Sequence, residues 1–185
     1  MESVRTRYGW PLIGLHWLTF LLIAAVYATA ELSDAFPKGS AARSSLRAGH
    51  EMIGLLVLAL VGLRVAVRMF STVPAIVPTP PRWQALLATA AHLALYGLMV
   101  VLPLVGWLML SAAGKPIPFF AWELPPLLAP NRSLAKVLED VHETVASVGY
   151  ALIGLHAAAA LFHHYVVRDN TLRRMLPGMG GALLR

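Results

Sequence analysis

Four long apolar runs constrain the fold of this chain more than any other feature of its sequence. They cover about residues 11–32, 49–70, 83–111 and 141–167. Each run is long enough to cross the hydrocarbon core of a bilayer, which takes about 20 residues of helix. Because lipid offers the backbone no hydrogen-bond partner, a run that crosses it has to be helical. The sequence therefore predicts an all-α integral membrane protein, a bundle of four transmembrane helices that forms one domain over residues 1–185.

The composition also favours a lipid bilayer as the surroundings. Hydrophobic residues make up 58% of the chain and charged residues 13%, whereas an ordinary soluble domain is about one quarter charged. The net charge of +6 comes from basic residues that lie between the apolar runs, so we expect no nucleic-acid partner. The chain has no cysteine, which excludes disulfides, thiolate metal sites, iron–sulfur clusters and haem attached through cysteine.

The basic residues predict the orientation in the membrane. An even number of spans places both termini on one side, and the side richer in Lys and Arg faces the cytoplasm. The side of the termini carries nine, Arg5, Arg7, Arg64, Arg68, Arg82, Arg168, Arg173, Arg174 and Arg185. The other side carries six, Lys38, Arg43, Arg47, Lys115, Arg132 and Lys136. We therefore expect both termini in the cytoplasm.

The first apolar run has a second interpretation. Arg5 and Arg7 precede it, and Ala28-Thr29-Ala30 follows it, as in a secretory signal peptide with its cleavage site. The run is about 19 residues long, beyond the usual 7–15 residues of a signal sequence. We therefore expect it to remain as a membrane helix.

Seven histidines, at positions 16, 50, 92, 142, 156, 163 and 164, lie within or at the edge of these runs. Polar side chains are costly in lipid and often mark function. His50 and His142 are expected to begin their helices at the outer side, and His16 to lie toward the inner side. His156 follows His142 by 14 residues, about 21 Å along a helix and within about 40° of the same face.

This spacing predicts two histidine pairs at two depths, His50 with His142 outside and His16 with His156 inside. Two imidazoles that converge from different helices, without a carboxylate or thiolate, suit the axial positions of a haem iron. Zinc is the competing metal, but it takes three or four protein ligands in a tetrahedral set. Gly149, midway between the two histidines of the last run, leaves room for a flat macrocycle or for close helix packing.

Two further residues are expected at the inner level. Arg64 follows His50 by 14 residues on the same helix face and thus reaches the depth of His156. It would neutralise a haem propionate, or else extend to the inner headgroups. His92 also lies near the inner level, where it either hydrogen-bonds a cofactor or replaces His16 or His156 as a ligand.

Several segments resemble the bacterial cytochrome b561 family, in particular its superoxide oxidase type. They are GLHW, LRVAVR, AHLALYGLMVVLPLVGW and HETVASVGYALIGLHAAAALFHHYVVRDNTLRRMLPG, and the likeness covers nearly the whole chain. The resemblance implies a bacterial inner-membrane protein with two non-covalent haems b, ligated by His16, His50, His142 and His156. It also implies superoxide from the periplasm as electron donor and ubiquinone as acceptor.

This resemblance gives two more residues an expected role. Arg47 lies three residues before His50, on its face, where it would attract an anionic substrate. Acidic residues also flank the outer histidines and oppose that attraction, namely Glu51, Glu139, Asp140 and Glu143. His163 lies about 10 Å deeper than His156, where it would bond and protonate the quinone, or else be an ordinary interfacial histidine.

Two alternative functions differ in class from this enzyme. One is an electron-carrying anchor, the cytochrome b subunit of a larger respiratory dehydrogenase or hydrogenase. The other is a haem-free metal transporter, but the deep positions lack the carboxylates that such a protein needs. The enzyme hypothesis requires no protein partner.

Overall fold

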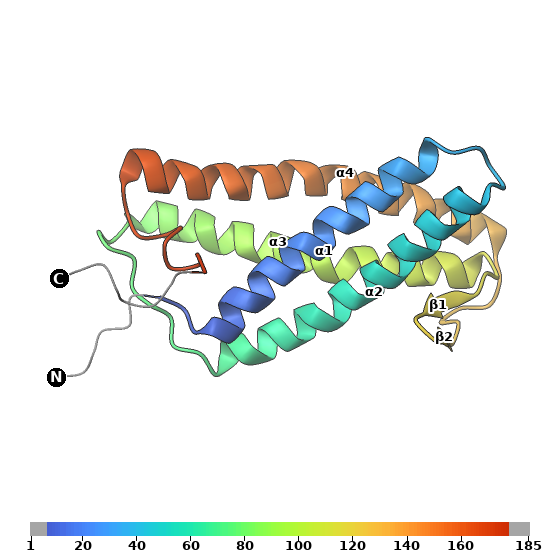
Figure 1. The fold of residues 1–185 in the computed structure, drawn as a ribbon, viewed down its shortest axis with the longest axis horizontal. Coiled ribbons are helices and arrows are strands. Elements are labelled where there is room, and N and C mark those ends of the chain that lie inside the picture. Colours follow the sequence, from blue (N-terminus) through green and yellow to red (C-terminus); the bar gives the residue numbers. More distant parts are fainter. Residues whose placement is uncertain (1–6, 178–185) are drawn as a thin grey trace.

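The computed structural model describes residues 7–177, and four long helices dominate it (Figure 1). They are α1 (Trp10–Asp34), α2 (Ala41–Met69), α3 (Arg82–Ala112) and α4 (Arg132–Phe162). Each is long and apolar enough to cross a membrane, which confirms the predicted all-α membrane fold. The start of α1 and the end of α4 lie at one end of the bundle, here named the inner end. The opposite end is named the outer end.

Two helices begin earlier than the hydropathy pattern predicted. The starts expected near residues 49 and 141 were wrong, because α2 and α4 begin at Ala41 and Arg132. The side chains of Ser40 and Asn131 each accept a hydrogen bond from a backbone N–H three residues later. Such caps extend a helix through a polar turn that apolar content does not reveal. The outer histidines therefore lie well inside their helices.

The helices pack as two pairs. α1 runs along α2 and α3 runs along α4, and α2 joins the pairs by packing on α3 (Figure 1). In the described part of the chain, no Cα atom of α1 comes within 8 Å of one in α4. Side chains span the space between them, as where Tyr27 Oη donates a hydrogen bond to the Ala146 carbonyl at 2.9 Å. This separation leaves an interior lined by side chains from all four helices.

A short hairpin that the sequence did not predict closes part of the outer end. Its strands, β1 (Ile117–Phe119) and β2 (Trp122–Leu124), pair antiparallel. Ile117 is 1% exposed and packs with Leu55 of α2 and Leu110 of α3. Three-residue strands are too short to give a periodic pattern. The hairpin fixes α2 against α3 near the outer histidines.

The chain folds back on itself at the inner end. α4 continues as a π-helix, η1 (His163–Val167), and residues 168–177 then form a C-terminal segment. Residues 71–81, between α2 and α3, form a strap across this end. The Asn170 side chain of the segment accepts a hydrogen bond from the Val77 N–H of the strap at 2.9 Å and donates one to the Ala75 carbonyl at 3.1 Å. Trp17 of α1 donates to a carbonyl of the segment at 2.8 Å. These contacts hold the segment across the inner end.

Candidate functional site

The outer histidine pair comes together between α2 and α4. The ring centroids of His50 and His142 are 6.1 Å apart, with an angle of 68° between the ring planes. Two imidazoles on opposite sides of one metal ion, each bound through a nitrogen about 2 Å away, have centroids about 6 Å apart. The spacing therefore fits a single metal ion between these rings.

Hydrogen bonding orients one ring of this pair. Nδ1 of His50 donates to the Val26 carbonyl of α1 at 3.0 Å. A carbonyl only accepts, so Nδ1 carries the proton and Nε2 keeps its lone pair. A backbone carbonyl behind the imidazole is the usual support of a metal-binding histidine, because it fixes both tautomer and orientation.

The second ring of the pair lies against α3. A Cβ placed on Gly106 would be 3.4 Å from His142 Cε1, at contact distance, so the ring lies directly against this glycine. Nδ1 of His142 is buried and makes no hydrogen bond of ordinary geometry with residues 7–177, although the ring also interacts with the backbone of Leu102. A buried polar atom without a partner costs about 1–3 kcal/mol, a cost that metal binding through this atom removes. The donor set thus fits a metal ion bound by two imidazoles.

Three imidazoles meet at the inner level. The centroids of His16 and His156 are 6.3 Å apart, at 64° between planes. His92 of α3 approaches the same His156 ring to 5.5 Å, at 72°. His156 is thus common to both possible pairs, and the His16 spacing resembles that of the outer pair more closely.

Arg64 reaches into this group rather than to the headgroups. Its Nη2 donates a hydrogen bond of 3.0 Å to Nδ1 of His16, and its guanidinium lies 5.5 Å from the centroid of the Tyr96 ring. Arginine has only donors, so Nδ1 of His16 accepts and the proton of the neutral ring is on Nε2. That tautomer cannot bind iron through Nε2. Either Arg64 releases His16 when a cofactor binds, or His92 pairs with His156.

A mostly apolar cavity lies among these inner residues. Its lining includes His16, Arg64, His92 and His156 but no carboxylate. The positive charge of Arg64 therefore has no acidic partner in the cavity wall, and a ligand that carries carboxylates, as haem does through its propionates, would supply one. Among the described residues, no group of three or more His, Cys, Asp or Glu could hold a metal ion.

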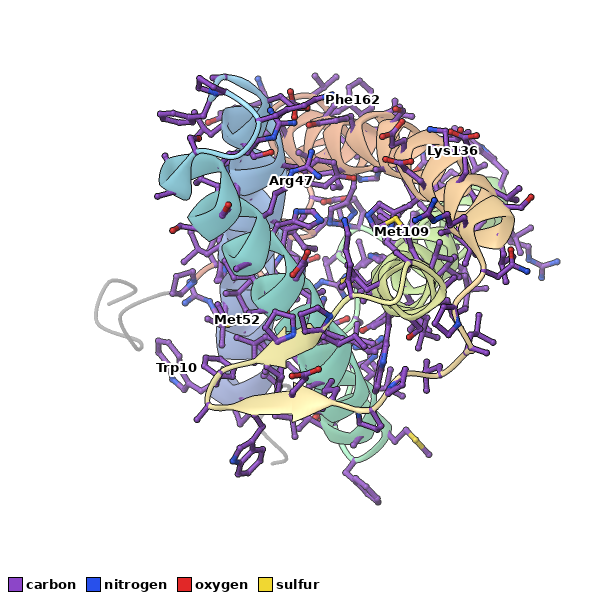
Figure 2. All side chains as sticks on the ribbon, turned by 90° about the vertical axis from the view of Figure 1, so that its right-hand side faces the viewer. Trp10, Arg47, Met52, Met109, Lys136 and Phe162 are labelled. Atoms are coloured by element: carbon purple, nitrogen blue, oxygen red, sulfur yellow. The ribbon has the colours of Figure 1, made fainter. Side chains whose placement is uncertain are left out.

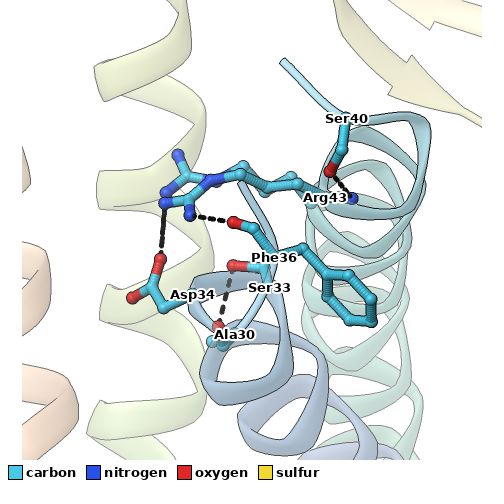
Figure 3. A network of polar contacts seen from close by, with 7 residues as sticks. Ala30, Ser33, Asp34, Phe36, Ser40 and Arg43 are labelled. Carbon is cyan, nitrogen blue, oxygen red and sulfur yellow. Dashed lines mark hydrogen bonds and ion pairs between the residues drawn. The ribbon is translucent and has the colours of Figure 1, made fainter. Parts of the chain in front are cut away.

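Two arginines of α2, Arg43 and Arg47, share one acidic partner at the outer end. Arg43 donates to Asp34 at 2.6 Å and to the Phe36 carbonyl at 2.9 Å (Figure 3). Arg47 lies 3.5 Å from the same carboxylate, and its side chain remains 54% exposed. Asp34, the last residue of α1, was not predicted as their partner, because only the turn between α1 and α2 brings it to these arginines. Arg47 is therefore a partly neutralised but accessible cation.

Two of the acids expected to repel an anion are paired. Lys136 of α4 contacts Glu139 at 3.1 Å and Asp140 at 3.0 Å, one helical turn away. Figure 2 views the bundle from its outer end and shows both Arg47 and Lys136 there, on α2 and α4. Lys136 offsets one of these two negative charges, so together the acids oppose an approaching anion less than their number suggests.

His163 forms a close pair at the inner end. Its Nδ1 lies 2.6 Å from Oδ2 of Asp169, whose side chain is 1% exposed. The backbone N–H of Thr171 donates to Oδ1 of the same carboxylate at 2.8 Å. Burial raises the pKa of Asp169, but the hydrogen bonds from His163 and Thr171 outweigh it, and the pKa lies below its usual value. No role was predicted for Asp169 from the sequence.

Comparison with known proteins agrees with this arrangement. Residues 7–178 match the prokaryotic cytochrome b561 family. The chain belongs to this family. It is therefore a prokaryotic membrane protein of electron transfer, and membership implies haem b. The histidine rings, spaced to hold a metal ion between them, fit that cofactor, and so does the charge of Arg64, which has no acidic partner in the cavity wall.

Three relatives match this chain almost end to end. Cytochrome b561 homolog 1 of Escherichia coli (strain K12) is 40% identical over 171 residues, 92% of this chain and 97% of the relative. A probable superoxide oxidase, CybB of Yersinia pestis, is 35% identical over 175 residues, 95% of this chain and 98% of the relative. Cytochrome b561 homolog 2 of Escherichia coli (strain K12) is 31% identical over 171 residues, 92% of this chain and 91% of the relative.

Proposed function

We propose that this cytochrome b561 binds two haems b and carries electrons from superoxide at its outer end to ubiquinone at its inner end. The observation that carries the proposal is that imidazole rings meet at two depths, with centroids 6.1 Å apart at the outer level and 6.3 Å apart at the inner level, a spacing that fits one metal ion between two rings. Their histidines on α4 are 14 residues apart, about 21 Å of helix. The 35% identity to a probable superoxide oxidase supports the choice of substrate.

The chain supplies ligands and charge for the cofactors. His50 and His142 would hold the outer haem, and His156 with His16 or His92 the inner one. Bound at these positions, haem b supplies a one-electron iron couple. The guanidinium of Arg64 would leave His16 for a propionate, which frees Nδ1 of that imidazole for a proton and Nε2 for iron.

The outer end would receive the donor. Superoxide is an anion, and Arg47 beside the outer pair raises its local concentration. In the net reaction two superoxide anions lose one electron each and leave as two molecules of O₂. One quinone takes both electrons and two protons and becomes one quinol. Atoms and charge balance without a further reactant.

The inner end would serve the acceptor. Quinone is lipid-soluble and reaches this end through the bilayer. Nδ1 of His163 is engaged by Asp169, so Nε2 is the nitrogen available to donate a hydrogen bond, and then a proton, to a quinone oxygen. Protons for this step come from the side that the basic residues assign to the cytoplasm.

Stopped-flow spectroscopy of the purified protein tests the proposal. Superoxide should reduce the haems faster than it dismutates, and ubiquinone added afterwards should reoxidise them. Arg47→Gln should slow the first step and weaken its dependence on salt, because it removes steering at a screened surface. Lys136→Gln makes the same change in net charge at the same end and should have a smaller effect, because Lys136 lies six residues from His142 whereas Arg47 lies three from His50.

The opposite result favours the second candidate function. If superoxide fails to reduce the haems, the protein fits the electron-carrying anchor of a larger respiratory dehydrogenase or hydrogenase. Co-purification of a partner subunit from membranes would then be expected.

A further inference from the structure

The C-terminal segment holds a buried carboxylate that the proposed reaction does not yet use. Both oxygens of Asp169 are engaged, Oδ2 by Nδ1 of His163 and Oδ1 by the backbone N–H of Thr171. No lysine or arginine among the described residues forms an ion pair with it. A buried charge is costly unless it is paired and hydrogen-bonded. His163 is therefore the side chain that offsets the charge of Asp169.

Backbone geometry brings the carboxylate to the imidazole. The π-helix η1 widens the last turn of the span, and Arg168 then adopts a left-handed conformation with φ of 60°. This turn carries Asp169 back over His163, whose carbonyl accepts the Asp169 N–H at 3.2 Å. π-turns are uncommon and occur often at functional sites, and a non-glycine residue at positive φ is unfavourable. The chain thus adopts two uncommon conformations next to this contact.

We propose that Asp169 is a positioning residue that sets the tautomer and orientation of His163 for proton delivery to the quinone. This inference rests on the proposed function, in which His163 serves that substrate. An ionised carboxylate only accepts, so Nδ1 of His163 keeps its proton and Nε2 exchanges the other. The proton leaves Nε2 for a quinone oxygen, the ring becomes neutral, and water at the inner end returns a proton to Nε2. The carboxylate balances the charge of the protonated ring.

The isosteric change Asp169→Asn tests this role through hydrogen-bond direction. Asp169 supplies two acceptors, whereas an asparagine supplies one acceptor and one donor group. If the amide oxygen keeps the Thr171 N–H, the amide nitrogen faces His163 and forces its proton to Nε2. The neutral ring then has no lone pair on Nε2 to take up the next proton. The substitution keeps the shape of the side chain and changes the tautomer.

The assay uses the full chain with its haems, reduced by dithionite without oxygen and mixed with a short-chain ubiquinone. Asp169→Asn should slow haem reoxidation by at least about 10-fold, with little change in the quinone concentration that gives half the maximal rate. Its haem content and its reduction by superoxide should match the wild type. Asn170→Ala is the matched control, because it removes two hydrogen bonds of the same segment and leaves the His163 contact.

The outcomes separate this inference from the function on which it rests. If quinone does not reoxidise the wild-type haems, the proposed function and the positioning role of Asp169 are both wrong. If it does and Asp169→Asn reacts as fast, the positioning role alone is wrong. If Asn170→Ala slows the reaction equally, the reaction depends on the conformation of the C-terminal segment and not on the Asp169 contact, and the positioning role is also wrong. When Asp169→Asn is placed in a His163→Gln background, it should slow the reaction no further.

A measurement of the tautomer in the wild-type protein does not depend on the activity of any variant. Solid-state NMR of ¹⁵N-histidine-labelled protein reports which ring nitrogen carries the proton, and His163→Gln identifies the signal by its loss. The inference expects a protonated Nδ1 in the neutral ring. A proton on Nε2 alone would overturn it.

Discussion

Replacing Gly149 by alanine tests whether the space between α1 and α4 is set by direct contact. Gly149 is buried in α4, midway between the two histidines of that helix. A Cβ at this position would overlap Tyr27 Oη and lie 3.1 Å from Leu98 Cδ2. The tyrosine cannot move aside easily, because it donates to the Ala146 carbonyl and packs on the Tyr150 ring at 4.3 Å.

The expected loss of stability follows from three opposing contributions. Overpacking costs about 1–3 kcal/mol, and loss of the Tyr27 hydrogen bond costs about 1 kcal/mol. The better helix propensity of alanine returns about 1 kcal/mol. The net effect of Gly149→Ala is a destabilisation of about 2 kcal/mol. Because α1 would be pushed from α4, the inner haem between them should also be held less firmly.

Gly154→Ala is the matched control, since the same substitution five residues along α4 meets nothing within 4 Å. Thermal unfolding in detergent, followed by helical circular dichroism and by loss of the haem Soret band, compares the two variants. Gly149→Ala should lower the midpoint by several degrees and release haem first, whereas Gly154→Ala should match or exceed the wild type. Equal midpoints for the two variants would refute the role of the Tyr27 contact.

Three further predictions concern the outer haem ligand, the inner haem ligands and the outer arginines. Gly106→Ala should shift the outer haem spectrum slightly, because it places a methyl group in van der Waals contact with the His142 ring, whereas Gly97→Ala on the same helix, with nothing within 4 Å, should not. His16→Ala should lose the inner haem and His92→Ala should keep it; the reverse result in haem quantitation assigns His92 as the ligand. Asp34→Asn should speed reduction by superoxide at low salt, because it frees both outer arginines; an unchanged rate in stopped-flow measurements contradicts the steering argument.

The sequence was sufficient for the spans and for the meeting of the histidines because both depend on simple periodicities. Apolar length identifies helices in lipid, and a separation of 14 residues returns a side chain to nearly the same helix face. These two rules place His50 near His142 and His156 near His16. The role of these histidines as iron ligands stays a prediction.

Other features depend on contacts that no local pattern encodes. The early start of α4 rests on the cap by Asn131, and the hairpin rests on the fit of Ile117 between two helices. The contact of Asp169 with His163 requires a π-turn and a left-handed residue in succession. A carboxylate six residues after a histidine at the end of a span is the signal that would have suggested it.

Haem quantitation by the pyridine haemochrome method on the purified chain tests the central claim most directly. The account predicts two haems b per chain, and one in each of the variants His142→Ala and His156→Ala. The remaining haem should differ between the two variants in its spectrum, because each removes a ligand from a different level. A wild-type protein with one haem or none, or loss of both haems in either variant, would contradict the two-level arrangement.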